Sequence, residues 1–229
     1  MLEATEPRTT TTRRSRYWWP MRVLSGVVVF LVVGNLMILG AHLLFQRVAP
    51  AGAAPAIPVD NFAVVDGRLW RGGAPSTPAY EALADAGVTT IVDLRAEKDV
   101  AVDEDALGSL GLERFHLPLR DGQAPSPELV ERFLQIVDDS EGRVFVHCGA
   151  GVGRTGTMAA AYLVERDGAS PAEVLRRNLA VGPPSLEQLA FASRLEQGEI
   201  KRAPAALVAI SRVLDAPRRV WVGVRHSYE

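Results

Sequence analysis

The segment His147–Gly156 constrains the fold of this chain more than any other, because it places a glycine-rich loop between two regular elements. Val144–Val146 precedes it and predicts a buried strand, and Thr157–Leu163 follows it and predicts a helix. A strand, such a loop and a helix N-terminus in this order form a cradle in which backbone N–H groups and the helix dipole bind an anion.

Cys148 and Arg154 supply the reactive groups of this loop. The field that binds an anion also stabilises a thiolate, so Cys148 is predicted to be a nucleophile rather than a small buried hydrophobe. The planar guanidinium of Arg154 suits two phosphate oxygens at once. The amides expected to bind the substrate phosphate with it belong to Gly149, Ala150, Gly151, Val152 and Gly153. Together these groups predict a thiolate that attacks a phosphate monoester.

The run His147–Thr155 resembles the His-Cys-x5-Arg-Ser/Thr signature of the cysteine-dependent protein tyrosine phosphatase superfamily. Leu69–Pro75 and Ile91–Arg95 are similar to the N-terminal half of its compact dual-specificity group, which includes fungal inositol-pyrophosphate phosphatases. The resemblance covers roughly residues 60–198. It implies an α/β fold, with a central, mainly parallel twisted sheet flanked by helices. It also implies hydrolysis through a cysteinyl-phosphate intermediate, with no metal and no cofactor.

The proton donor to the leaving group is predicted to be Asp121, in a loop directly after a predicted strand. Asp121–Pro125 resembles the general-acid loop of dual-specificity phosphatases, and the same carboxyl group would accept a proton from water in the second step. The alternative is that Asp121 only stabilises a turn before Gly122. Three further carboxylates are reserve candidates, although they resemble a solvated helix face: Asp103, Glu104 and Asp105.

Residues beside the nucleophile have expected supporting roles. Thr155 is predicted to hydrogen-bond the departing sulfur. His147 is predicted to orient the loop through backbone hydrogen bonds rather than to act as an acid. Arg71 and Arg95 are expected either at the substrate edge or in structural roles, and a buried pair of Asp93 with Arg95 is an equally good interpretation.

The stretch Val23–Phe45 contains no charged residue and is predicted to cross a membrane. As a helix it would span roughly 34 Å, and a hydrocarbon core is about 30 Å thick. Five arginines precede it and one follows it closely: Arg8, Arg13, Arg14, Arg16 and Arg22, then Arg47. The positive-inside rule therefore places the N-terminus in the cytoplasm and the rest of the chain outside. The alternative is a signal peptide cleaved at Ala51–Ala53 or Ala54–Ala56, which also exports the domain.

The chain is expected to consist of a basic tail (1–22), a transmembrane anchor (23–46), a linker (47–59), a phosphatase domain (60–200) and a C-terminal extension (201–229). Beyond residue 47 there are 19 basic and 25 acidic residues. This balance argues against a nucleic-acid partner. The single cysteine excludes an internal disulfide and a multi-cysteine metal site. The predicted partners are a phosphorylated protein or small phosphomonoester, and the membrane through residues 23–46.

Strands and helices alternate from residue 60 onwards, which predicts the parallel sheet independently of the resemblance. Asp66-Gly67 predicts a hairpin between 62–65 and 68–71. Further strands are predicted at 90–94, 114–117 and 144–146. Helices are predicted at 76–87, 101–110, 127–137, 157–163, 171–179 and 185–195. In the C-terminal extension, residues 205–214 predict a helix and residues 219–224 a strand.

The substrate class follows less directly. Positions 149–153 are all neutral, whereas relatives that take highly charged inositol phosphates often carry lysine there. A phosphoprotein, tyrosine-phosphorylated especially, is therefore favoured over an inositol phosphate or phosphoinositide. Two other classes are alternatives. A non-catalytic, membrane-anchored pseudophosphatase would lack the nucleophile, arginine or acid, and a rhodanese-like sulfurtransferase would lack the Arg-Thr ending of the loop.

Overall fold

A computed structural model of the chain describes residues 18–48, 55–96 and 103–214. The chain divides into two compact units, Met1–Met37 and Ile38–Glu229. Helix α1 (Trp18–Val48) begins five residues before the predicted anchor and ends two residues after it. Within α1, Trp19–Phe45 is long and apolar enough to cross a membrane, a character that a signal sequence near an N-terminus shares.

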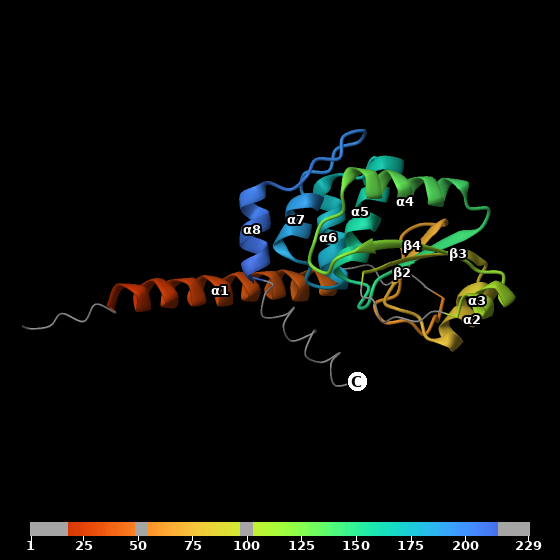
Figure 1. Ribbon diagram of the computed structural model, residues 1–229, viewed down its shortest axis with the longest axis horizontal. Coiled ribbons are helices and arrows are strands. Elements are labelled where there is room, and N and C mark those ends of the chain that lie inside the picture. Colours follow the sequence, from red (N-terminus) through yellow and green to blue (C-terminus); the bar gives the residue numbers. More distant parts are fainter. Residues whose placement is uncertain (1–17, 49–54, 97–102, 215–229) are drawn as a thin grey trace, which may run out of the picture. The chain divides into compact units, whose positions relative to one another are not determined.

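The second unit contains a five-stranded sheet in the order β1-β2-β5-β3-β4 (Figure 1). Its strands are β1 (Ala63–Val64), β2 (Leu69–Gly72), β3 (Val88–Arg95), β4 (Glu113–Leu119) and β5 (Arg143–His147). Only β1 is antiparallel to its neighbour, so the predicted mainly parallel sheet is confirmed. The predicted hairpin is confirmed as well. Asp66 closes its turn, because its Oδ1 accepts hydrogen bonds from the N–H groups of Arg68 (2.8 Å) and Leu69 (2.6 Å).

Helices cover both faces of this sheet. After α1, the described helices are α2 (Thr77–Asp85), α3 (Glu104–Ser109), α4 (Pro127–Asp139), α5 (Gly153–Asp167), α6 (Pro171–Val181), α7 (Leu186–Ala192) and α8 (Ala205–Leu214), of which α8 packs on α7. Figure 1 shows α2 and α3 on one side of the sheet and α4 to α7 on the other.

The core follows from the alternation of side chains along the strands. On β5, Phe145 points into the cluster formed with Leu83 of α2 and Leu107 of α3. Its neighbours Val144 and Val146 point into the larger cluster, which α4 to α7 cover. The central strand is therefore buried on both sides, and it can hold the loop that follows it in a fixed position.

Two element boundaries near the predicted site differ from expectation. Strand β4 continues to Leu119, through Pro118, because β4 is an edge strand and a missing N–H is tolerated there. Helix α5 begins at Gly153, four residues earlier than its apolar pattern indicates. The predicted helix over 101–110 is observed over Glu104–Ser109, and that over 205–214 is confirmed. Residues 101–102 and the predicted strand 219–224 lie outside the described residues.

Candidate active site

The loop Cys148–Val152 connects the carboxyl end of β5 to the N-terminus of α5. Because β5 lies between β2 and β3 and runs parallel to both, this loop leaves the sheet at its centre. In the strand register, His147 is paired with Gly72 on one side and with Asp93 on the other. The thiol-bearing residue itself is buried, since Cys148 is 3% exposed. A ligand at this edge is surrounded by the ends of three parallel strands.

Five consecutive carbonyl groups of this loop accept hydrogen bonds from groups around it. In order, the donors are His147 Nδ1 to Cys148 O (3.3 Å), Ala74 N to Gly149 O (2.9 Å), Asn61 Nδ2 to Ala150 O (2.9 Å), and Arg71 Nη2 to Gly151 O (2.8 Å) and Val152 O (3.2 Å). In a trans peptide, the next N–H points away from the carbonyl. The N–H groups of residues 149–153 therefore point away from these partners, an arrangement that is suited to binding an anion.

Gly151 allows the loop to run close against the sheet. Its φ is +71°, a conformation that glycine adopts without strain. A Cβ at this position would collide with the backbone of Gly72 and Gly73. Gly151 is thus a position in the Cys148–Val152 loop where both the backbone conformation and the close approach to the sheet require glycine.

Arg71 lies under the loop and not at the substrate edge. It is 4% exposed, and besides the two loop carbonyls its Nη1 donates to Asn178 Oδ1 at 3.0 Å. Burial lowers the pKa of Arg71 to about 10, against the opposing effect of the Cys148 charge. The guanidinium therefore remains charged at neutral pH, and it fixes the loop through a planar fork.

Arg154, in the first turn of α5, contacts the end of β4 and the loop that follows it. Its side chain is 5% exposed, its Nη1 donates to Leu119 O at 3.1 Å, and its Nε lies 3.5 Å from Asp121 Oδ1. The neighbouring Thr155 is fully buried, and its Oγ1 has no hydrogen-bond partner among the described residues. Of the four residues predicted to be catalytic, Cys148 lies in the loop after β5, Asp121 lies in the loop after β4, and Arg154 and Thr155 lie in the first turn of α5.

Residues 120–125, here called the acid loop, connect β4 to α4 and carry Asp121. The residues at the start of α7 hold three successive positions of this loop. Ser185 Oγ donates to Gly122 O (2.7 Å), Gln188 Nε2 donates to Gln123 O (3.2 Å), and Glu187 Oε1 accepts from Ala124 N (3.0 Å). None of these three hydrogen bonds involves Asp121, and its side chain remains 31% exposed.

The reserve carboxylates have structural contacts elsewhere. Asp103 caps α3 by accepting a hydrogen bond from Ala106 N, and Glu104 forms an ion pair with Arg114 at 2.6 Å. Asp105 is exposed on the same helix. Asp121 is therefore the carboxylate among these candidates with a contact to Arg154.

Asp93 is the charged centre of a buried network beside the nucleophile loop. Its carboxylate is 1% exposed and binds Arg95 at 2.7 Å and Arg114 at 2.8 Å, so the predicted Asp93–Arg95 pair is confirmed. Burial alone raises the pKa of Asp93, but the hydrogen bonds from Arg95 and Arg114 outweigh it and hold the pKa far below its usual range. This network lies next to His147, whose Nε2 is 3.9 Å from Asp93 Oδ1.

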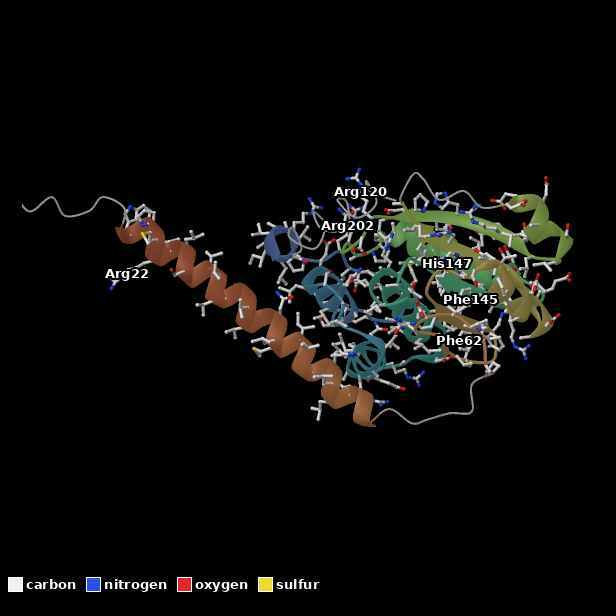
Figure 2. All side chains as sticks on the ribbon, turned by 90° about the horizontal axis from the view of Figure 1, so that it is seen from below. Arg22, Phe62, Arg120, Phe145, His147 and Arg202 are labelled. Carbon is white, nitrogen blue, oxygen red and sulfur yellow. The ribbon has the colours of Figure 1, made fainter. Side chains whose placement is uncertain are left out.

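His147 is fully buried and supports the loop from behind. Burial lowers its pKa to about 4, although the Asp93 charge acts in the opposite direction. The ring is therefore neutral at pH 7, and since a carbonyl only accepts, the proton lies on Nδ1 facing Cys148 O. Phe62, Phe145 and His147 form a stack, with ring centroids 6.4 Å and 5.9 Å apart (Figure 2).

Sequence reasoning missed several residues of the site. Asn61 is the described non-glycine residue with positive φ (+53°), and nothing in its local sequence marks its contact with the loop. Asn178 of α6 holds Arg71 and also lacks a signal. Ser185 and Gln188 did carry one, because Ser-x-x-Gln before a helix predicts a capping box, which the structure contains. Within the described residues, no group of three His, Cys, Asp or Glu side chains is placed to hold a metal ion.

A family model described as "DSP-PTPase phosphatase fused to NAD+ Kinase" matches residues 58–194. Among curated proteins, the dual specificity protein phosphatase CDC14A of Mus musculus is 31% identical over 152 residues, which are 61% of this chain and 25% of the mouse protein. The chain thus spans a quarter of the length of that relative.

Solved structures agree on the fold. The active form of Tk-PTP is 27% identical, with a TM-score of 0.51 over 56% of this chain and 91% of that one. The core catalytic domain of the PP-IP phosphatase SIW14 from S. cerevisiae has a TM-score of 0.54 over 70% of this chain and 97% of that one. At 20% identity, its likeness concerns the fold alone.

Proposed function

Because this chain belongs to the DSP-PTPase phosphatase family, and with it to the cysteine-dependent protein tyrosine phosphatase superfamily, we propose that it dephosphorylates proteins through a cysteinyl-phosphate intermediate. The observation that carries this proposal is the outward orientation of the five carbonyls of Cys148–Val152, which leaves the loop amides for an anion. An anion cradle beside a cysteine suits a phosphate ester better than any uncharged substrate.

In the first step, the Sγ of Cys148 attacks phosphorus, the S–P bond forms and the P–O bond to the leaving group breaks. Arg154 and the amides of residues 149–153 hold the three non-bridging oxygens, whose charge is redistributed in the transition state. Asp121 transfers its proton to the departing oxygen. The 3.5 Å distance between Asp121 and Arg154 supports this role, because it keeps the carboxyl group beside the phosphate-binding guanidinium.

In the second step, water attacks phosphorus and the S–P bond breaks. Asp121, now a carboxylate, takes the proton from water, as microscopic reversibility requires. Thr155 donates a hydrogen bond to the departing sulfur, and its buried hydroxyl without a partner in the described part of the chain is consistent with this task. His147 keeps a supporting role, since its buried neutral ring donates to the loop backbone.

Phosphoproteins are the substrates that the site favours. Residues 149–153 carry no lysine, so the cradle has one guanidinium for one phosphate group and lacks the extra cations that a polyphosphorylated inositol would need. The related mouse protein is named a dual specificity protein phosphatase, which supports the same substrate class.

Phosphate release from p-nitrophenyl phosphate by the full chain, purified in detergent, tests the catalytic part of the proposal. We expect Cys148→Ser to lose turnover by orders of magnitude and to retain binding of inorganic phosphate. Unchanged turnover in this variant, or none in the unaltered chain, would contradict an enzyme of this class. A phosphotyrosine peptide is expected to turn over faster than inositol hexakisphosphate, and the reverse order would assign the substrate to the inositol phosphates.

We also propose that α1 anchors the chain as a single span, with the N-terminus in the cytoplasm and the phosphatase domain outside it. The five arginines before the apolar stretch, against one closely after it, support this orientation. A reporter enzyme that works only outside the cytoplasm should be active when fused after Glu229. An active cytoplasmic reporter at the same position would reverse the orientation, and a shortened mature chain would indicate a cleaved signal peptide.

A further inference from the structure

A buried glutamate that takes no part in the proposed chemistry supports the acid loop. Glu187, in the first turn of α7, is 6% exposed. Its Oε1 accepts a hydrogen bond from Ala124 N at 3.0 Å, three residues beyond Asp121. Its Oε2 is buried and has no hydrogen-bond partner among the described residues. Burial of a carboxylate is unfavourable unless its interactions offset the lost solvation. The hydrogen bond from Ala124 N is the interaction with the acid loop that Glu187 gains at this buried position.

Two neighbours of Glu187 explain why it points at this loop. Ser185 and Gln188 form the capping box of α7, and both also bind the acid loop through Gly122 O and Gln123 O. Gln188 further lies against the start of α5, where a Cβ on Gly153 would meet its Oε1 at 2.5 Å. The start of α7 therefore contacts both the acid loop and the start of α5, and Glu187 supplies the bond nearest to α4.

The C-terminal helix fixes the backbone of Glu187. Glu187 N donates to Ser211 Oγ at 3.0 Å, and Ser211 is fully buried between α8 and α7. A hydrogen bond thus runs from α8 to the residue that holds the acid loop. This contact connects the predicted C-terminal extension to the active site, although its sequence carries no catalytic motif.

We propose that Glu187 is a positioning residue, which holds the acid loop so that Asp121 reaches the leaving oxygen, and that Ser211 of α8 completes this support. The inference rests on the proposed role of Asp121 as the general acid. A loop held on one side by Arg154 through Leu119 O and on the other by Glu187 through Ala124 N has a fixed middle, where Asp121 lies. Loss of either of these two hydrogen bonds would displace the Asp121 carboxyl group and leave the group itself intact.

Leaving-group dependence distinguishes this role from a purely structural one. Nitrophenolate departs readily without a proton, whereas the phenolate of phenyl phosphate needs one. We expect Glu187→Ala to lower kcat of the full chain on phenyl phosphate about tenfold or more, and on p-nitrophenyl phosphate by much less. Glu187→Gln keeps an acceptor for Ala124 N and should retain most of the activity. Ser211→Ala should shift the same ratio in the same direction by a smaller factor.

The matched control is Glu165→Ala, since Glu165 also accepts a hydrogen bond from a loop amide, Gly198 N, at 3.1 Å but does not contact the acid loop. It should leave the ratio of the two rates unchanged. In an Asp121→Asn background, Glu187→Ala should cause no further loss.

An equal loss on both substrates, or a further loss in the Asp121→Asn background, would overturn the positioning role of Glu187. An unchanged rate in Asp121→Asn alone would instead reject Asp121 as the acid, which is a separate failure. If Glu187→Ala does not fold, the ratio measured for Ser211→Ala decides, and an unchanged ratio there overturns the proposal.

Discussion

The Nε of Arg154, in the first turn of α5, lies 3.5 Å from the Oδ1 of Asp121, in the loop after β4. The guanidinium is nearly excluded from solvent at 5% exposure, whereas the carboxyl group keeps 31%. In the proposed mechanism the buried cation holds a phosphate dianion, and the partly exposed carboxyl group is accessible to water. The groups proposed for phosphate binding and for proton transfer are thus adjacent and lie in different environments.

Asp121→Asn should separate these two tasks. We expect kcat on phenyl phosphate to fall by about 100-fold or more, because a positioned general acid contributes this much, and affinity for inorganic phosphate to persist. Steady-state kinetics and phosphate competition measure the two effects. Asp103→Asn is the control, since asparagine can still cap α3, and its rate should stay within about twofold. Equal rates in both variants would show that Asp121 only stabilises its turn.

Arg71→Lys should disable the loop while the motif itself stays intact. Lysine cannot reproduce a planar fork that reaches Asn178 and two loop carbonyls, so those buried acceptors lose partners. We expect kcat/KM to fall about tenfold or more and the free energy of unfolding to fall by about 1–3 kcal/mol.

Arg68→Lys is the matched control for this prediction. Arg68 also donates to backbone carbonyls, those of Val137, Asp138 and Ser140, but at the end of α4 and away from the nucleophile loop. It should lose stability and keep its activity. Similar kinetic losses in both variants would mean that Arg71 acts on stability alone.

The elements closest to the nucleophile were predictable because their signals are local. Cys148, Arg154 and the glycines between them occupy one short segment, and the apolar strand before it and the helix after it need no distant information. The hairpin at Asp66-Gly67 was predictable for the same reason. The start of α5 was not, because Gly153 and Arg154 interrupt the apolar periodicity that marks the rest of the helix.

The residues that hold the nucleophile loop in place could not be predicted from local sequence patterns. Asn61 and Arg71 belong to the region of the β1–β2 hairpin and Asn178 belongs to α6, both far from the loop in sequence, and the sheet order β2-β5-β3 and the packing of α6 on α5 bring them to the loop. A strand register cannot be read from one sequence when several strands are equally apolar. The role of Arg71 therefore stayed open between substrate edge and structure until its hydrogen bonds were known.

Gly151→Ala should inactivate the protein through geometry. A methyl group at φ +71° is strained, and here it would also collide with the backbone of Gly72 and Gly73, so the loop must shift. Since the amide cradle depends on that loop, kcat should fall by two orders of magnitude or more. Gly198→Ala has a similar φ of +78° and open space around it, and should cost only about 1 kcal/mol of stability with normal turnover. Normal activity in Gly151→Ala would show that the loop tolerates the shift.

His147 should make stability depend on pH in a defined window. Its pKa is about 4 in the folded protein, whereas an unfolded chain has a histidine pKa of about 6.5. Between these values the unfolded state binds a proton that the folded state does not, so stability is full above pH 6.5 and falls as the pH is lowered towards 4. The loss across this window amounts to about 3 kcal/mol. Urea unfolding of the full chain at several pH values between 7 and 4.5 measures it. In His147→Asn, whose amide can still donate to Cys148 O, the slope of the unfolding free energy against pH should correspond to about one proton fewer. An unchanged slope in His147→Asn would mean that His147 has the same pKa in the folded and unfolded states. Burial would then not keep its ring neutral behind the nucleophile.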